Sequence, residues 1–239
     1  MKEKVTAVIL AAGQGKRMSI PVAKQFLMLE DKPVLYYSIK AFEESCVDEI
    51  VLVSSGEQID YCVHNIVEPY GFKKISSVIE GGKERYDSVY QALLKIDYTD
   101  YVLIHDGARP FISSSLINEF AEAVKESGAC IVAAPVKDTI KVVDSNGWIT
   151  DTPDRECMWQ AQTPQGFEYQ AIRKAYELLF QEEPSKLKKI TDDAMVYERY
   201  IHLPVKVMKG DYYNIKLTTP EDMILAQGIV KGKLEKAEI

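Results

Sequence analysis

The sequence predicts an α/β protein built on a doubly wound, mostly parallel sheet, and two patterns predict it. Short and almost continuously apolar runs recur along the chain, as is typical of strands that are buried on both faces. Between these runs, apolar residues recur at spacings of three and four, which indicates amphipathic helices. This alternation favours a parallel sheet covered by helices on both faces. The predicted strands are Val5–Ala11, Glu49–Ser54, Ile75–Ile79, Tyr101–His105 and Ala129–Ala134.

The predicted helices lie between and after these strands. Towards the carboxyl end we expect helices over 168–180 and 192–199, a polar loop through 184–189, a strand near Val205, and a last helix from Pro220. The apolar positions that mark the first three helices are Leu35, Ile39 and Phe42, then Val89, Ala92, Leu93 and Ile96, and then Leu116, Phe120 and Val124.

The alternation of strands and helices fails between about residues 136 and 165. There, two short runs of strand-forming residues flank a turn at Asp144–Gly147, which indicates a β-hairpin. A hairpin that leaves an α/β body is either a dimer contact or a plain surface hairpin, and the residues alone leave both open. We therefore expect a single domain over residues 1–239 with a β-arm at about 137–160, and no second enzyme domain.

The charge of the chain excludes one class of partner. The 239 residues carry a formal net charge of −7. A general nucleic-acid-binding protein needs a broad excess of Lys and Arg, so this charge argues against nucleic acid as a partner. Positive charge is nevertheless concentrated in residues 1–27, which hold five cations and one acid. A small anion is the natural partner of such a concentration.

Cysteines, histidines and apolar runs exclude further classes. The cysteines at 46, 62, 130 and 157 include no C-x-x-C pair, which indicates reduced thiols in a cytoplasmic protein. The histidines are equally scattered, so neither a zinc site nor a Cys/His nucleophile is indicated. The run Val5–Ala12 is far shorter than the roughly 20 residues of a membrane span and ends in a basic turn. We therefore expect neither a membrane anchor nor a signal peptide.

The first predicted strand runs into a glycine turn, Gly13-Gln-Gly15. A dinucleotide site would need a third glycine, where Met18 stands, and an acid after the second strand, where Ser54 and Ser55 stand. A phosphate-binding P-loop would need the motif G-x-x-x-x-G-K-[ST], which the chain lacks. Neither of these two familiar nucleotide sites is therefore predicted.

Three cations, Lys16, Arg17 and Lys24, follow the glycine turn. In a flexible loop they can converge on one triphosphate, because Arg offers a planar fork of donors and Lys a point charge. A solvated basic loop without a ligand is the alternative.

Residues suited to ligand binding also follow later strands, at the edge where open α/β sheets bind their ligands. Asp106 and Arg109 follow the strand that ends at His105. They form either a structural salt bridge or a site in which the Asp106 carboxylate is a hard oxygen ligand for Mg²⁺ that carries nucleotide phosphates.

A second glycine pair, Gly81 and Gly82, follows the third strand, and Arg85 and Ser88 come just after it. Backbone amides and a hydroxyl at the start of a helix can line a base or a ribose. A helix start without a ligand explains the same pattern equally well.

Nine segments of the chain, taken together, match the motifs of one known enzyme family. They are Ala11–Met18, Lys24–Leu27, Gly81–Ser88, His105–Pro110, Ala134–Thr139, Asp154–Arg155, Gln162–Gln165, Thr191–Ala194 and Asn214–Asp222. Together they resemble the 2-C-methyl-D-erythritol 4-phosphate cytidylyltransferases, enzymes of the non-mevalonate route to isoprenoids. The likeness spans nearly the whole chain, so it is far more specific than any single glycine motif.

The resemblance implies a Rossmann-like, three-layer nucleotidyltransferase fold and a homodimer joined through the β-arm. It also implies that CTP and 2-C-methyl-D-erythritol 4-phosphate react to give 4-diphosphocytidyl-2-C-methyl-D-erythritol and pyrophosphate. Mg²⁺ or another divalent cation would assist.

The resemblance also implies roles for individual residues. Arg17 and Lys24 would stabilise the transition state on the triphosphate. The residues expected to position the methylerythritol phosphate are Arg155, which would reach across the dimer, Lys216, Arg109, Thr139 and Thr191. Those expected to bind the nucleotide are Ala11, Ala12, Gly13, Gly15, Gly81, Gly82, Arg85, Ser88 and Asp106, and Asp106 would also lie beside the metal.

Two positions depart from the family pattern. Ser19 stands where the family usually has glycine, and Ala23 replaces the proline that commonly precedes Lys-Gln. The cations keep their spacing, so we expect the path of the loop to differ more than its chemistry.

Two other functions compete with this interpretation. A ribitol 5-phosphate cytidylyltransferase shares the fold, the cations and the reaction. That group more often has alanine-valine where this chain has Gly107-Ala108. A non-catalytic nucleotide-binding protein on the same fold would be expected to have lost the catalytic cations, which this chain retains.

Overall fold

The structure is a computed structural model, and it describes residues 2–13, 23–183, 187 and 189–237. Within these residues, seven strands form one sheet in the order β11-β7-β10-β6-β1-β4-β5. Neighbouring strands are parallel except β10, which runs antiparallel to both β6 and β7. The bounds are β1 Val5–Leu10, β4 Glu49–Ser54, β5 Ile75–Glu80, β6 Tyr101–Asp106, β7 Ala129–Pro135, β10 Trp159–Glu168 and β11 Lys206–Lys209.

The central strand β1 explains why the predicted strands are continuously apolar. Ala7 and Ile9 pack into one hydrophobic cluster, and Val8 between them packs into another. Successive side chains of a strand point to opposite faces of the sheet, so both faces of β1 are covered. The expected α/β fold and its mostly parallel sheet are confirmed.

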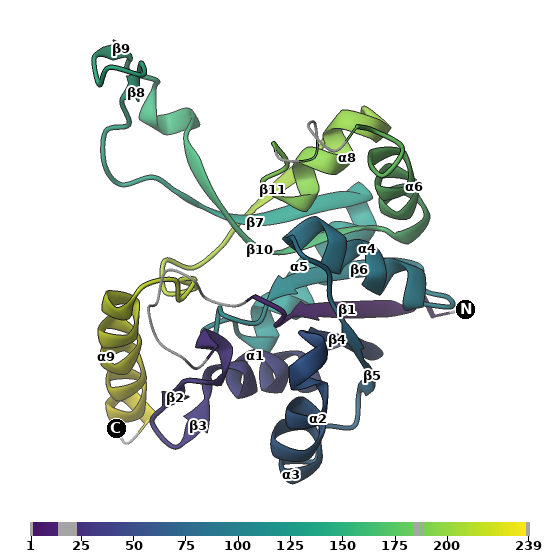
Figure 1. Cartoon of the computed structure of the whole chain (residues 1–239). Helices are drawn as coiled ribbons and strands as arrows, with labels where there is room; N and C mark the ends of the chain where they lie inside the picture. The colour runs from purple at the N-terminus through teal and green to yellow at the C-terminus, as the bar shows by residue number, and fades with distance from the viewer. Residues whose placement is uncertain (1, 14–22, 184–186, 188, 238–239) are drawn as a thin grey trace.

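Helices cover the two faces of this sheet (Figure 1). Residues of α1 (Val34–Glu43) and α5 (Ser114–Ser127) belong to the cluster on one face. Residues of α4 (Arg85–Lys95), α6 (Tyr169–Leu179) and α8 (Asp193–Ile201) belong to the cluster on the other. The sheet and the helices on its two faces form three layers, which confirms the predicted arrangement of strands and helices.

Residues 56–70 form a helical segment that the sequence patterns do not predict. It consists of a 3₁₀ turn, η3 (Gly56–Gln58), α2 (Ile59–Cys62), a π-helical stretch over 63–67 and α3 (Glu68–Tyr70). Only Cys62 and Ile66 of this segment are buried, because it covers the edge of the apolar cluster rather than its centre. Two inward side chains are too few to give a clear helical period.

Side-chain caps fix where two helices of the later site begin. Glu84 and Asp87 form a capping box, in which each side chain accepts a hydrogen bond from the backbone N–H of the other. Asp192 caps α8 by accepting from the N–H of Met195 at 3.0 Å. The caps therefore make Arg85 the first residue of α4 and Asp193 the first residue of α8.

Strand β10 is another element that the sequence patterns do not predict. Its residues are rich in glutamine and include Pro164, which follows a cis peptide bond. The pairing with β7 shifts between Ala161 and Gln165, so Pro164 lies within an irregularity where no ladder donor is needed. Because of its polar side chains and its proline, the composition of β10 does not predict a strand, although the sheet buries much of it.

The expected hairpin is present. Strands β8 (Val142–Val143) and β9 (Ile149–Asp151) pair antiparallel across the turn, where Gly147 has a φ of 85°. Figure 1 shows this arm projecting away from the sheet. Its apolar side chains are exposed: Ile140, Val142, Val143, Trp148 and Ile149.

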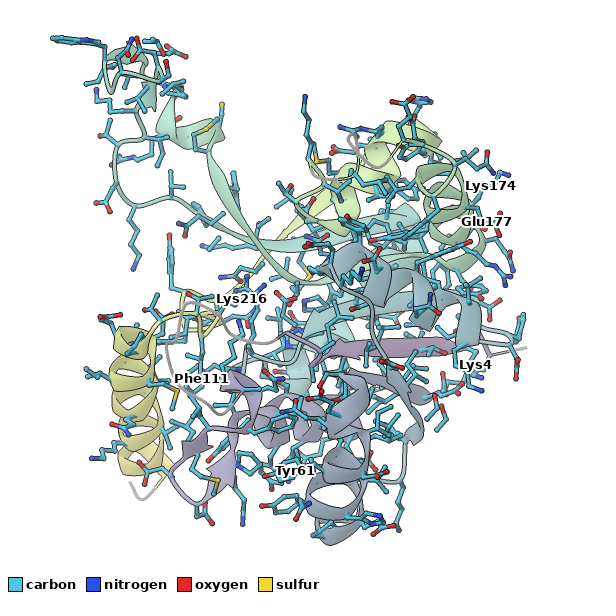
Figure 2. All side chains as sticks on the ribbon, viewed as in Figure 1. Lys4, Tyr61, Phe111, Lys174, Glu177 and Lys216 are labelled. Carbon is cyan, nitrogen blue, oxygen red and sulfur yellow. The ribbon has the colours of Figure 1, made fainter. Side chains whose placement is uncertain are left out.

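The carboxyl-terminal helix α9 (Pro220–Ala237) packs on a small hairpin rather than on the sheet. The hairpin consists of β2 (Met28–Leu29) and β3 (Lys32–Pro33). Buried residues of α9 meet Leu29 and Phe111 in a third apolar cluster (Figure 2). Among the described helices, none has the length and apolarity that crossing a membrane requires.

Candidate functional site

The segments after four parallel strands are joined at the carboxyl edge of the sheet. The N–H of Ala11 donates to the carbonyl of Val53, and the N–H of Gly107 donates to the carbonyl of Leu10. The N–H of Gly81 likewise donates to the carbonyl of Ser54. These bonds bring together the ends of β1, β4, β5 and β6 at the edge where open α/β sheets bind their ligands.

Gly81 and Gly82 form a close-packed cradle beside the end of β1. A Cβ at Gly81 would lie 2.6 Å from the Ser88 hydroxyl oxygen and 2.7 Å from the Cβ of Ala12. A Cβ at Gly82 would lie 2.1 Å from the Cβ of Asp87. Ser88 is buried and its hydroxyl accepts from the N–H of Gly82 at 3.1 Å. Both glycines are therefore required by packing, and the expected nucleotide residues Ala12, Gly81, Gly82 and Ser88 lie together.

Lys24 lies in a 3₁₀ turn, η2 (Lys24–Phe26), and is half-buried. The next residue, Gln25, is buried and donates its side-chain amide to the carbonyl of Ala11 at 2.5 Å. This bond holds the turn beside the end of β1. Arg17 and Gly15 lie outside the described residues. Gln25 belongs to the Lys24–Leu27 segment of the family pattern but is not among the predicted site residues, because the motif does not show that its side chain reaches Ala11.

Asp106 is the centre of the candidate site. Among the described residues, three cationic side chains surround its carboxylate: Lys216 at 2.8 Å, Arg85 at 3.3 Å and Arg109 at 3.7 Å. Burial alone would raise the pKa of Asp106. The positive charges of Arg85, Lys216 and Arg109 outweigh burial and hold that pKa well below its usual range. Asp106 is therefore a permanent anion within a cationic cluster.

Arg85 links Asp106 to a second carboxylate. Its Nη1 and Nη2 donate to the two oxygens of Asp193 at 2.8 and 2.6 Å, while its Nε faces Asp106. Tyr176 donates its hydroxyl to Asp193 at 2.6 Å. The carbonyl of the Gln165 side chain accepts from the N–H groups of Asp193 and Ala194, both at 3.0 Å. Asp193, Tyr176 and Gln165 are not among the predicted site residues, although Gln165 and Asp193 lie in segments of the family pattern, because their partners are distant in sequence.

His105 supports the turn that carries Asp106 and Arg109. Its Nε2 lies 3.3 Å from the carbonyl of Arg109, which can only accept, so Nε2 carries the proton. Its Nδ1 then accepts from the Thr163 hydroxyl, whose oxygen accepts from the N–H of Asp106. Burial lowers the pKa of His105 to about 4. The imidazole is therefore neutral at physiological pH and serves to fix the turn.

The segment that carries Lys216 is tied to the same turn. Arg109 donates from Nη1 to the carbonyl of Asn214 at 2.7 Å, and Asn214 donates its side-chain amide to the carbonyl of Thr163 at 2.9 Å. The N–H of Leu217 donates to the carbonyl of Ala108. Figure 2 shows Lys216 at the opposite end of the sheet from Lys4. Asp106, Arg109 and Lys216 are thus brought together in one cluster.

The remaining predicted substrate residues lie away from this cluster or at its margin. Arg155 is exposed on the arm and donates to the carbonyl of Lys137 at 3.2 Å. Thr139 is exposed at the base of the arm. Thr191 is exposed just before α8, where its hydroxyl lies 3.6 Å from the sulfur of Met195. Within this chain, none of the three has a hydrogen bond to Asp106, Arg109 or Lys216 among the described contacts.

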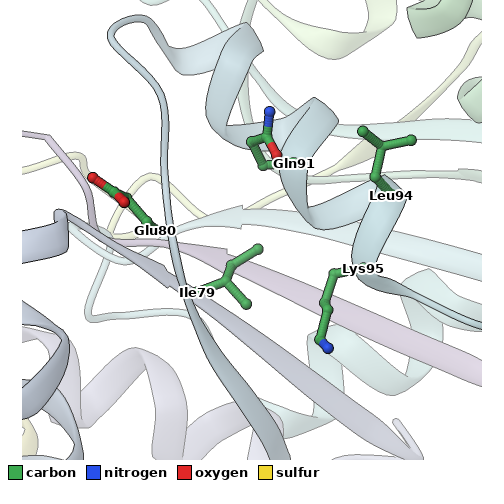
Figure 3. Close-up of a pocket in the computed structure, with 5 residues that line it drawn as sticks. All are labelled: Ile79, Glu80, Gln91, Leu94 and Lys95. Atoms are coloured by element: carbon green, nitrogen blue, oxygen red, sulfur yellow. The ribbon is translucent and has the colours of Figure 1, made fainter.

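Two shallow surface pockets lie outside the cluster. The larger, about 360 Å³, lies between the edge strand β5 and α4 (Figure 3). The smaller, about 270 Å³, lies at the base of the arm. The larger is lined by Ile79, Glu80, Gln91, Leu94 and Lys95, and the smaller by Val136, Lys137, Asp138, Ile140, Gln160 and Tyr212. Neither gathers the polar groups that converge on Asp106, so the cluster is the better candidate site.

The described residues do not include a preformed metal site. No group of three or more His, Cys, Asp or Glu side chains among them could hold a metal ion. The carboxylate of Asp106, the expected metal ligand, is already shared by three cations. In this arrangement Asp106 is not suited to be a ligand of a divalent cation.

A family model described as "2-C-methyl-D-erythritol 4-phosphate cytidylyltransferase" matches residues 5–232. The chain belongs to this family. It is therefore a nucleotidyltransferase of the non-mevalonate isoprenoid pathway, as the sequence motifs predicted.

Individual cytidylyltransferases agree with the family match. The chain is 50% identical over 229 residues to the 2-C-methyl-D-erythritol 4-phosphate cytidylyltransferase of Lachnoclostridium phytofermentans, covering 96% of this chain and 97% of that one. The crystal structure of 4-diphosphocytidyl-2C-methyl-D-erythritol synthase from Anaerococcus prevotii superposes with a TM-score of 0.84 and 33% identity. This superposition covers 96% of each chain. The cytidylyltransferase of Thermus thermophilus superposes with a TM-score of 0.74 and 27% identity, covering 94% and 98%.

These relatives decide between the competing functions. The matched family is named for the methylerythritol substrate rather than for ribitol, and it is a family of enzymes. Neither the ribitol 5-phosphate enzyme nor a non-catalytic nucleotide-binding protein is supported.

Proposed function

We propose that this cytidylyltransferase uses CTP and 2-C-methyl-D-erythritol 4-phosphate, and that the cluster around Asp106 receives the sugar phosphate. The cluster joins two anions, Asp106 and Asp193, to three cations, Arg85, Arg109 and Lys216. It therefore has an excess of positive charge next to the glycine cradle. An anionic substrate held there would face a nucleotide bound over the cradle.

The proposed reaction is an in-line attack by a phosphate oxygen of the sugar phosphate on the α-phosphorus of CTP. The new oxygen–phosphorus bond gives 4-diphosphocytidyl-2-C-methyl-D-erythritol, and the bond to the leaving pyrophosphate breaks. A phosphate monoester has a second pKa of about 6, so the nucleophile is already an anion at neutral pH. The reaction needs positioning and charge stabilisation rather than a general base. The buried, hydrogen-bonded state of His105 agrees with that requirement.

Lys24 and Arg17 are proposed to stabilise the charge that develops on the triphosphate. The bond from Gln25 to Ala11 supports this role for Lys24, because it holds the turn of Lys24 against the strand that precedes Gly13. A cation that the fold already holds in place, as proposed for Lys24, acts in the transition state without having to reorient.

Lys216 and Arg109 are proposed to hold the sugar phosphate. Lys216 is the more accessible of the two, with about a third of its side chain exposed, whereas Arg109 is nearly buried. Lys216 would therefore contact the phosphate directly. Thr191, at the start of α8, is proposed to contribute a hydroxyl at the margin of the same site.

The cytidine is proposed to bind over the glycine cradle. Backbone N–H and carbonyl groups from Ala11 to Gly15, with Gly81, Gly82 and Ser88, would contact it. Arg85 has carboxylate partners for Nε, Nη1 and Nη2, which favours a supporting role beneath the nucleotide over direct contact.

A divalent cation, Mg²⁺ in the simplest case, is proposed to arrive bound to the oxygens of the triphosphate. There it would neutralise part of the phosphate charge. The cationic surroundings of Asp106 are the reason to favour phosphate oxygens over Asp106 as its ligands.

The arm is proposed to form a homodimer in which Arg155 and Thr139 of one chain reach the substrate site of the other. The exposed side chains of Trp148 and Ile149 support a partner for the arm, since an apolar patch of this kind is costly to leave in water. We also propose a cytoplasmic location, which the four unpaired cysteines support.

The deciding experiment is pyrophosphate release by the purified full chain with CTP and one polyol phosphate at a time. Release with 2-C-methyl-D-erythritol 4-phosphate, and much slower release with ribitol 5-phosphate, is expected. Equal release with both would contradict the proposed substrate, and release with neither would contradict the proposed reaction.

A further inference from the structure

The carboxylate of Asp193 lies next to the candidate site, but it is buried beneath Arg85 and out of reach of a substrate. Asp193 is fully buried, yet it accepts two hydrogen bonds from Arg85 and one from Tyr176. It is the first residue of α8, on the side of the sheet covered by α4, α6 and α8. Burying a carboxylate is costly unless it is paired and hydrogen-bonded, so its partners define what it does.

Arg85 is shared unequally between two carboxylates. It lies 2.6 Å from Asp193 and 3.3 Å from Asp106, measured from the nearest nitrogen to oxygen. The attraction between two charges is strong in a buried setting and weakens with distance. The Arg85 guanidinium is therefore attracted more strongly to Asp193 than to Asp106. Asp106 is left with an oxygen for Lys216, at 2.8 Å.

We infer that Asp193 is a positioning residue: by holding Arg85, it leaves Asp106 free to orient Lys216. This inference rests on the proposed function, in which Lys216 holds the sugar phosphate. Without the charge of Asp193, the partly buried Arg85 keeps one carboxylate partner, Asp106, and is drawn towards it. Asp106 then holds Lys216 less firmly, and the amine loses its fixed direction.

A purely structural role for Asp193 makes a different prediction. In that case Asp193 only fastens the start of α8, through Tyr176 and Gln165. Its loss would loosen the fold without a specific effect on Lys216. The state of the Lys216 amine therefore distinguishes the two roles.

The test is trace labelling of lysine amines with acetic anhydride in the full chain, quantified peptide by peptide by mass spectrometry. Lys40, which pairs with Glu44 on α1, is the internal reference. In Asp193→Asn, labelling of Lys216 relative to Lys40 is expected to rise about threefold or more, an effect of the size that contiguous polar networks transmit. Unchanged labelling of Lys216 in the folded variant, or an equal rise at both lysines, would overturn the inference.

A matched control removes a paired carboxylate elsewhere. Asp48 pairs with Lys2 and accepts from the N–H of Val5, at the opposite end of β1 from the site. Asp48→Asn is expected to leave the labelling of Lys216 as in the unchanged chain. A rise at Lys216 in this variant would mean that general loosening explains the effect.

A second variant keeps the inference testable if Asp193→Asn does not fold. Arg85→Met with Asp193→Leu replaces this ion pair, of which Asp193 is fully buried, by apolar side chains, an exchange that many proteins tolerate. Asp106 then has no competing Arg85 and is left to Lys216 and Arg109, so labelling of Lys216 is expected to fall below that of the unchanged chain. Opposite directions in the two variants follow only from a positioning role, and a rise in the double variant would overturn it.

Steady-state kinetics connect the inference to the reaction. In Asp193→Asn, KM for 2-C-methyl-D-erythritol 4-phosphate is expected to rise about tenfold, while KM for CTP changes about twofold or less. The labelling needs no turnover. An enzyme that releases no pyrophosphate would therefore contradict the proposed function and leave the labelling result standing. Altered labelling with an unchanged KM would overturn the positioning role alone.

Discussion

Gln25 donates its side-chain amide to the carbonyl of Ala11 at 2.5 Å, and so connects the residues on the two sides of the segment 14–22. Both residues are buried, and Lys24 comes directly before Gln25. This buried hydrogen bond therefore helps to hold the turn that carries a proposed catalytic cation.

Lys24→Ala is expected to lower kcat by about 10²-fold, the scale of losing one preorganised charge stabiliser, and Arg17→Ala to do the same. Gln25→Leu is expected to lower kcat less, because it leaves the charge and removes only its support. Pyrophosphate release at saturating substrates measures all three. Lys40→Ala, an exposed lysine on α1, is the control. A kcat near that of the unchanged chain in Lys24→Ala would refute its role.

Lys216→Ala is expected to raise KM for the sugar phosphate by about tenfold or more, since it removes a charged hydrogen-bond partner of the phosphate. CTP binding is expected to be largely retained, and calorimetry with CTP alone measures it. Lys174→Ala, an exposed lysine on α6, is the control. Equal losses of CTP and sugar phosphate binding would contradict the separation of the two subsites.

Gly81→Ala is expected to weaken CTP binding and to destabilise the fold by about 1–3 kcal/mol, because the new Cβ meets Ser88 and Ala12 at less than 3 Å. Gly228→Ala is the matched control on α9, where a Cβ meets nothing within 4 Å. The control is expected to stabilise the helix by up to about 1 kcal/mol. Urea unfolding and calorimetric CTP binding measure both changes. Normal CTP affinity in Gly81→Ala would argue against the cradle as the nucleotide site.

Stability is expected to fall as pH falls from about 6.5 to about 4, because of His105. Its pKa in the folded chain is about 4, lowered by burial, whereas an unfolded histidine has a pKa of about 6.5. Between these two pH values His105 binds a proton in the unfolded chain but not in the folded chain. The free energy of unfolding therefore decreases as the pH falls below about 6.5. The loss reaches about 3 kcal/mol, an order-of-magnitude figure. The charged groups nearest the ring are Asp106, Arg109 and Lys216.

Urea midpoints at pH 7.5, 6 and 5 measure this dependence. His105→Gln keeps a donor for the carbonyl of Arg109 but cannot titrate, so its stability is expected to vary less over this range. His202→Gln, at an exposed histidine, is the control and is expected to keep the dependence of the unchanged chain. An equally steep dependence in His105→Gln would assign it to other groups.

Trp148→Ser with Ile149→Ser is expected to shift the chain from dimer to monomer in sedimentation velocity, because these side chains are 75% and 62% exposed on the arm. Activity is expected to fall with the dimer, since Arg155 would no longer reach a partner. Ile224→Ser, an equally exposed apolar residue on α9, is the control and is expected to leave the assembly unchanged. A dimer that survives the double change would exclude the arm as the contact.

Sequence patterns identified most strands and helices because burial on one or two faces leaves a regular trace. β1 reads as an unbroken apolar run since both of its faces are covered. β10 left no such trace. Its buried glutamines and Thr163 face polar partners at the site, so a central strand has the composition of a loop.

The sequence by itself determined the α/β order of elements, the glycine turns, the cations and the family to which they belong. Each helix, turn and family motif depends on residues close together in the chain. The tertiary structure alone decided that Asp106 lies among Arg85, Arg109 and Lys216, and that Asp193 holds Arg85 from behind. Arg85 and Asp193 are 108 residues apart, and no local spacing encodes a contact formed only when α4 and α8 pack on the same face of the sheet.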